Sequence, residues 1–110
     1  MTTLSLAPQY ISILQALGNV EEMLEDAIRA YVTERIGERI GKLQREILTF
    51  QKQYGLPFEK FYAQITTDEE FIKNLRESHP LWERDLNAWE YYIEELSEWL
   101  GRLESISKQS

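Results

Sequence analysis

Residues 19–54 read NVEEMLEDAIRAYVTERIGERIGKLQREILTFQKQY, a stretch without proline. Asn19 and Glu22 have the spacing of a capping box at its start, and Gly55 follows as a usual helix stop. Apolar residues recur every three or four positions, which places them on one face of an α-helix: Leu24, Ile28, Val32, Ile36, Ile40, Leu43, Ile47, Phe50 and Tyr54. The stretch therefore predicts one long helix.

Such a helix would be roughly 52 Å long, whereas a compact chain of this size has a diameter of roughly 35 Å. Either the helix bends, or it projects and buries its apolar stripe against a second chain. We expect a homodimer, because the stripe is longer than a small chain can cover alone. The residues expected at the dimer interface are Leu4, Leu6, Ile28, Val32, Ile36 and Ile40.

Two glycines, Gly37 and Gly41, interrupt the long helix with a G-x-x-x-G spacing. Each costs about 1 kcal/mol relative to alanine in a helix interior. They indicate either a ridge of small residues on which another helix packs closely, or a bend between two shorter helices. The sequence leaves both alternatives open.

The N-terminal segment precedes this helix. Thr2 to Leu6 alternate polar and apolar residues, as a short strand does. Pro8 suits the first turn of a following helix, and Gly18 would end that helix.

This order of strand, short helix, Gly-Asn turn and longer helix, in TLSLAPQYISILQALGNVEEMLEDAIRAYV (Thr3 to Val32), resembles that of ribbon-helix-helix proteins. The resemblance implies that strands from two chains pair, and that outward strand residues enter the DNA major groove. The alternative is that residues 1–18 form only a helix packed on the long one.

The outward strand positions would be Thr3, Ser5 and Ala7, without an arginine or lysine to read guanine or to hold phosphate. DNA binding is therefore expected to be weak. It would use Thr3, Ser5 and the backbone amides near Asn19 and Val20, where a helix N-terminus can hold a phosphate.

Beyond Gly55, the pattern predicts three further helices. Phe58, Phe61, Tyr62 and Ile65 mark a short amphipathic segment. Thr67-Asp-Glu-Glu70 has the pattern of a capping box for a helix over roughly residues 68–77. Pro80 then suits the start of a final helix.

The final helix carries an unbroken heptad seam, with spacings of four and three: Trp82, Leu86, Trp89, Ile93, Leu96, Leu100 and Leu103. All three tryptophans lie here, and residues 81–104 contain seven acidic but only two basic side chains. One interpretation is that this helix packs against the long helix as an antiparallel hairpin. The other is that its aromatic residues anchor a protein partner. The expected partner-binding residues are Trp82, Trp89, Tyr92, Glu95 and Trp99.

No catalytic pattern is present, because the sequence lacks cysteine, has a single histidine (His79) and contains no Gly-rich phosphate loop. The Glu-x-x-His motif of helical di-metal sites is also absent. We therefore expect neither an enzyme nor a protein that needs a cofactor or metal.

The composition further limits the classes of protein and of partner that fit this chain. The chain has 110 residues and a net charge of −7, of which −6 falls in residues 56–110. An acidic C-terminal half disfavours contact with nucleic acid or anionic lipid and suits a basic protein partner. The absence of cysteine and of a signal-like or membrane-spanning stretch fits a cytoplasmic protein.

The chain as a whole resembles small helical antitoxins of prokaryotic toxin–antitoxin operons. The resemblance rests on the N-terminal unit, on FQKQYGLPFEKF (Phe50 to Phe61) and on ERDLNAWEYYIEELSEWL (Glu83 to Leu100). It implies a C-terminal segment that neutralises a basic toxin and an N-terminal module that regulates transcription of its own operon. A helical adaptor or structural dimer without a DNA role is the alternative.

The predicted fold is all-α: a short N-terminal strand that can form a ribbon-helix-helix dimer, one long helix, and a C-terminal helical hairpin. Residues 1–36 would form the dimerisation unit, and residues 37–110 the partner-binding region.

Overall fold

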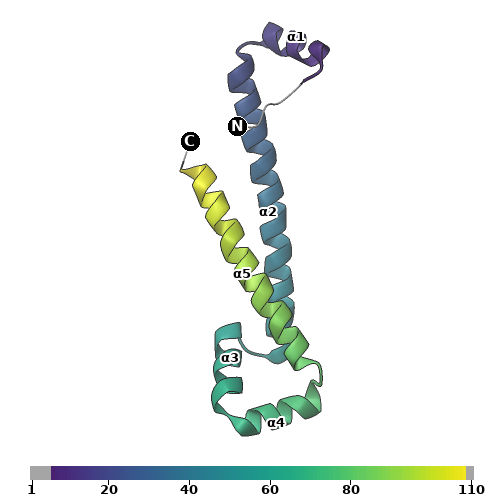
Figure 1. The fold of residues 1–110 in the computed structure, drawn as a ribbon, viewed down its shortest axis with the longest axis vertical. Coiled ribbons are helices and arrows are strands. Elements are labelled where there is room, and N and C mark those ends of the chain that lie inside the picture. Colours follow the sequence, from purple (N-terminus) through teal and green to yellow (C-terminus); the bar gives the residue numbers. More distant parts are fainter. Residues whose placement is uncertain (1–5, 109–110) are drawn as a thin grey trace. The chain divides into compact units, whose positions relative to one another are not determined.

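The computed structural model describes residues 6–108. Over these residues the chain forms five α-helices and no strand (Figure 1): α1 (Pro8–Leu17), α2 (Val20–Tyr54), α3 (Phe58–Thr67), α4 (Glu69–Ser78) and α5 (Trp82–Ser107). The predicted all-helical class is confirmed for this part of the chain. The predicted strand falls almost wholly outside it, and Leu6 and Ala7 at its end have no regular secondary structure.

Local signals set most of the helix ends. Pro8 lies in the first turn of α1, and Asn19 caps α2, where its Oδ1 accepts a hydrogen bond from the Glu22 amide at 3.1 Å. Gly55 ends α2 with φ +75, a conformation that favours glycine. These signals act within a single turn, which is why the sequence alone located them.

The cap of α4 differs from the expectation by one residue. Asp68, not Thr67, is the N-cap, and its side chain accepts a hydrogen bond from the Phe71 amide. Thr67 instead belongs to the last turn of α3, where its hydroxyl donates to the Ala63 carbonyl at 2.7 Å. Aspartate is as strong a cap as threonine, so the preceding helix could extend through Thr67.

The chain divides into two compact units, Met1–Arg35 and Ile36–Ser110, which we call unit 1 and unit 2. The boundary lies inside α2, one residue before the 36/37 boundary expected from the sequence.

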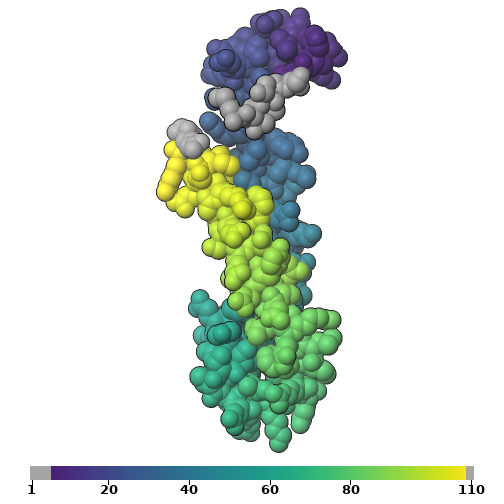
Figure 2. All heavy atoms as spheres, viewed as in Figure 1, coloured from purple at the N-terminus to yellow at the C-terminus, as the bar shows by residue number. Residues whose placement is uncertain are grey.

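The core of unit 2 forms where α3, α4 and α5 meet the end of α2. Phe61 and Trp89 have no exposed surface, and Leu75 is 6% exposed. Four aromatic rings of α2 and α3 surround the Trp89 ring at 5.4–6.0 Å between centroids: Phe50, Tyr54, Phe58 and Phe61. In the space-filling view, α3 and α4 pack together at the lower end of this unit (Figure 2).

Within unit 2, α5 runs antiparallel beside residues 36–54 of α2 (Figure 1). Ile36, Ile40 and Leu43 are buried on this side of α2. The last helix therefore packs against the long helix, with α3 and α4 in the connection between them. Ile36 and Ile40, which were expected at a dimer interface, have only 5% and 8% of their surface exposed. Little of these two side chains is therefore left exposed for contact with a second copy.

The described part of unit 1, residues 6–35, has no comparable core. None of its side chains from Leu6 to Arg35 is buried. Large apolar side chains are instead exposed on both of its helical segments: Tyr10, Ile13, Leu17, Ile28 and Tyr31.

The glycine pair of α2 does not support close helix packing. A Cβ atom added at Gly37 would have no neighbour within 4 Å, and one at Gly41 would meet only the Arg45 side chain, at 3.4 Å. No other helix therefore approaches these two positions closely in the part of the chain that the structure describes.

Candidate functional site

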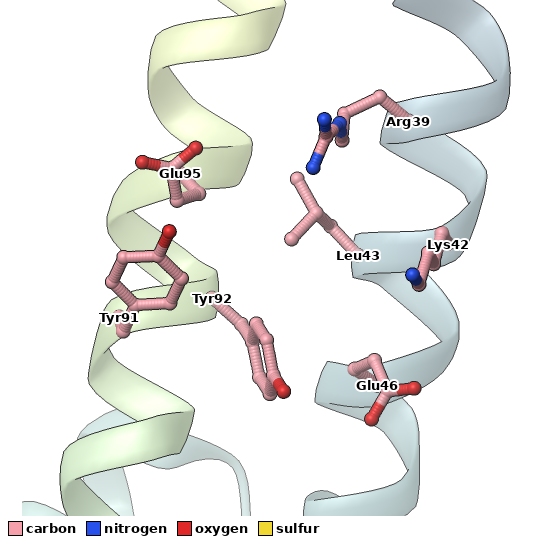
Figure 3. Close-up of a pocket in the computed structure, with 7 residues that line it drawn as sticks. All are labelled: Arg39, Lys42, Leu43, Glu46, Tyr91, Tyr92 and Glu95. Atoms are coloured by element: carbon pink, nitrogen blue, oxygen red, sulfur yellow. The ribbon is translucent and has the colours of Figure 1, made fainter.

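A groove of about 120 Å³ lies in unit 2 between α2 and α5 (Figure 3). Residues from α2 line one wall and residues from α5 the other: Arg39, Lys42, Leu43 and Glu46, facing Tyr91, Tyr92 and Glu95. Leu43 is the buried apolar residue at its base. The groove thus combines a small apolar floor with charged and phenolic groups at its rim.

The α5 wall presents two adjacent tyrosines with different surroundings. Tyr92 is half-buried and stacks on Phe50 of α2, with 6.1 Å between ring centroids. Tyr91 is 58% exposed and meets the Tyr92 ring edge-on at 5.9 Å. Tyr92 is therefore fixed by the packing of α5 on α2, whereas most of Tyr91 is available for contact.

The rim of the groove carries two cationic and two anionic side chains. Arg39 and Lys42 come from α2, together with Glu46, and Glu95 comes from α5. No ion pair joins Lys42 or Glu46 to another charged side chain within residues 6–108. These charges can therefore pair with groups of opposite sign on a bound segment without breaking an ion pair of the fold.

Trp99 lies next to the groove and is held by polar neighbours. The guanidinium carbons of Arg39 and Arg102 lie 5.6 Å and 4.4 Å from its ring centroid, as in cation–π contacts. Its indole Nε1 donates a hydrogen bond to Glu95 Oε2 at 3.3 Å. Because Arg39 belongs to α2, these contacts connect α5 to α2.

The five residues expected to bind a partner are therefore separated by the fold. Tyr92 and Glu95 line the groove, and Trp99 lies beside it. Trp89 is fully buried, and Trp82 packs against the same core. Tyr92 and Trp99, which were expected to bind a partner, are both half-buried on the side of α5 that contacts α2. Sequence reasoning missed Tyr91, which lies two residues from both Trp89 and Ile93 of the heptad seam and therefore faces away from it.

A buried carboxylate fixes the lower end of the same pair of helices. Asp85 of α5 is only 8% exposed, whereas most other acidic side chains of this helix are exposed. Its Oδ2 accepts hydrogen bonds from the Tyr54 hydroxyl at 2.6 Å and from Gln53 Nε2 at 3.2 Å. Its Oδ1 pairs with Arg84 at 3.3 Å. With three donors around it, this aspartate has a structural role.

Burial is the largest cause that raises the pKa of Tyr54 above its usual value. The hydrogen bond to Asp85 and the negative charge of that carboxylate act in the same direction, whereas Arg84 lowers the pKa. The Tyr54 ring also lies 4.8 Å from the ring of His79, the one histidine in the sequence. His79 caps the end of α4, where its backbone amide donates to the Leu75 carbonyl.

The residues expected to contact DNA have no comparable arrangement. Thr3 and Ser5 lie outside the described residues. The Asn19 side chain is engaged in capping α2, and Val20 is the half-buried first residue of that helix. Glu21 and Glu22 add two negative charges to the same first turn, where they would oppose a phosphate.

The remaining expected dimer residues fall in unit 1. Ile28 is 46% exposed and Val32 is half-buried. Leu6 is half-buried, and Leu4 lies outside the described residues.

No protein-family model, curated protein or solved structure matches this chain. Among residues 6–108, no three acidic or histidine side chains are grouped to hold a metal ion. None of the helices there combines the length and the apolar character that a membrane-spanning helix requires.

Proposed function

We propose that this protein is a non-enzymatic binding protein, and that α5 and the adjoining groove take a basic segment of another protein. A row of exposed carboxylates along α5 supports this proposal. These carboxylates recur at intervals of seven and four residues and therefore lie on one face of the helix. They belong to Glu83, Glu90, Glu94 and Glu98. Such a face attracts a basic partner and repels nucleic acid.

Tyr91 is the observation that carries the proposal. Its ring is 58% exposed at the rim of the groove, and it lies on the same helix as the acidic row. A tyrosine that offers apolar area and a hydroxyl, ringed by charged groups, is typical of an interface anchor. We assign to Tyr91 the anchoring role that the sequence suggested for Trp99, because the contacts of Trp99 are made within the chain.

A basic toxin would be one such partner, so the antitoxin hypothesis is a specific form of this proposal. The antitoxin hypothesis also includes formation of a homodimer and weak binding to operator DNA. An adaptor without a DNA role is the second candidate, and the acidic first turn of α2 favours it because Glu21 and Glu22 would repel a phosphate there.

The test is affinity capture from the source cells with two charge-reversed variants. Glu90→Lys with Glu94→Lys reverses the acidic row, while Glu34→Lys with Glu77→Lys makes the same change in net charge at exposed positions outside α5. A basic protein retained by the wild type and the control, but lost with the α5 variant, supports the proposal. Equal retention by both variants would contradict it.

A second measurement separates the two candidates. Expression of the captured protein alone should arrest growth, and co-expression of this chain should restore it, if the pair is a toxin and its antitoxin. A captured protein that is harmless when expressed alone would favour the adaptor.

A further inference from the structure

Unit 1 leaves several large apolar side chains exposed. It comprises 35 residues, and none of its side chains from Leu6 onward is buried. Folded segments of fewer than about 40 residues usually need disulfides, metals or oligomerisation. This chain contains no cysteine, and no group of acidic or histidine side chains among residues 6–108 could hold a metal ion. Of these three means of stabilisation, oligomerisation is the one that the described residues can supply.

The exposed apolar residues of α2 in unit 1 lie on one face of the helix. Leu24, Ile28, Tyr31 and Val32 follow one another at intervals of four, three and one residues, so all four lie within one third of the helix circumference. Ile28 and Tyr31 are 46% and 63% exposed, and Leu24 and Val32 are half-buried. We call this set the Ile28 stripe.

Charged residues mark the two ends of the Ile28 stripe. Glu21 lies on the same face seven residues before Ile28, and Arg35 lies seven residues after it. The Arg35 guanidinium carbon lies 6.0 Å from the Tyr31 ring centroid, which places the arginine beside the stripe. The stripe is thus acidic at its start and basic at its end.

We propose that a second copy of this chain covers the Ile28 stripe, with the two α2 helices antiparallel about a two-fold axis at Ile28. This axis places Ile28 against its own counterpart and Leu24 against Val32, four residues on either side. It also places Glu21 of each copy opposite Arg35 of the other. Such an interface is isologous, so every favourable contact occurs twice.

Charge selects the direction of the helices. A parallel pair would place Glu21 against Glu21 and Arg35 against Arg35, and like charges in contact are destabilising. The antiparallel pair turns both repulsions into attractions. The inference does not depend on the partner proposed for α5, because the residues involved belong to unit 1.

The first experiment measures the mass of the full chain by sedimentation equilibrium at micromolar concentration. The wild type should be a dimer, and Ile28→Asp should be a monomer, because a charge buried at the two-fold axis meets its own copy. Leu48→Asp is the matched control, since Leu48 is also 46% exposed but lies in unit 2. Circular dichroism and tryptophan fluorescence, which reports unit 2, would check that each variant remains folded.

The second experiment tests the register by exchanging charges. Glu21→Arg and Arg35→Glu should each raise the dimer dissociation constant about three- to tenfold, because two exposed ion pairs become repulsions. In an antiparallel dimer, the chain with both changes should bind its copy more tightly than either single variant. In a parallel dimer, each single change only exchanges one like-charge pair for another.

A monomeric wild type would overturn the proposal and would assign the Ile28 stripe to a different protein. Dissociation by Leu48→Asp but not by Ile28→Asp would place the interface in unit 2. A double exchange no tighter than the single changes would reject the antiparallel register.

Discussion

At the residue scale, Asp85 shows how one carboxylate can connect two helices. It joins the Tyr54 hydroxyl and the Gln53 amide at the end of α2 to the start of α5. Tyr54→Phe should lower the free energy of unfolding by about 1.5–3 kcal/mol, the contribution of a hydrogen bond to a charged group. Urea denaturation at neutral pH would measure this. The control is Tyr62→Phe, at a ring that is 48% exposed, with an expected change within about 0.5 kcal/mol.

Tyr54 should also make the stability of the protein depend on pH in the alkaline range. Because the folded state raises the pKa of Tyr54, it favours the protonated phenol, and this contribution to stability is complete below the unfolded pKa of about 10. It is lost as the pH rises above that value toward the folded pKa. The stability of the wild type should therefore fall more steeply above about pH 10 than that of Tyr54→Phe. Parallel curves for the two proteins would show that Tyr54 does not contribute this dependence.

At the element scale, Gly101 is a weak point of α5. It lies inside the helix, and an added Cβ atom would have no neighbour within 4 Å. Gly101→Ala should therefore raise the free energy of unfolding by about 1 kcal/mol, because alanine loses less conformational entropy in a helix. Thermal unfolding followed by circular dichroism would detect the change.

Gly55→Ala provides the opposite control. No atom crowds this position either, but its φ of +75 is strained for alanine. That substitution should lower stability although it adds the same methyl group. Similar effects of the two substitutions would show that backbone conformation is not the deciding factor.

At the scale of the whole molecule, the charge distribution should control how quickly a partner associates. Of the net charge of −7, −6 lies in residues 56–110, and most acidic groups of α5 are exposed. Raising salt should slow association with the captured basic partner strongly and change dissociation little, because screening acts mainly on the diffusional encounter. Surface plasmon resonance over a range of salt concentrations would separate the two rates.

The variant with Glu90→Lys and Glu94→Lys should associate slowly at every salt concentration and show a shallower salt dependence. If salt instead accelerates dissociation and leaves association unchanged, the acidic row takes no part in the encounter.

The sequence by itself determined the helices and most of their ends. Pro8, Asn19 and Gly55 act through hydrogen bonds and backbone angles within one turn, and such signals need no tertiary context. The spacing of the α5 seam likewise identified the face that would be apolar. It also predicted that Trp82 and Trp89 would lie on that face.

Only the tertiary structure decided what each face contacts. Trp89 is enclosed because α3 brings Phe58 and Phe61 against it, whereas Trp99, also on α5, meets Arg39 and Arg102. Asp85 resembles the other acidic residues of α5 in the sequence but is buried against the end of α2. Likewise, Ile36 and Ile40 are buried in unit 2, whereas Ile28 on the same stripe remains exposed. The period of the apolar residues predicts which side of a helix is apolar. The element that covers this side comes from a distant part of the chain, and no local pattern predicts those contacts.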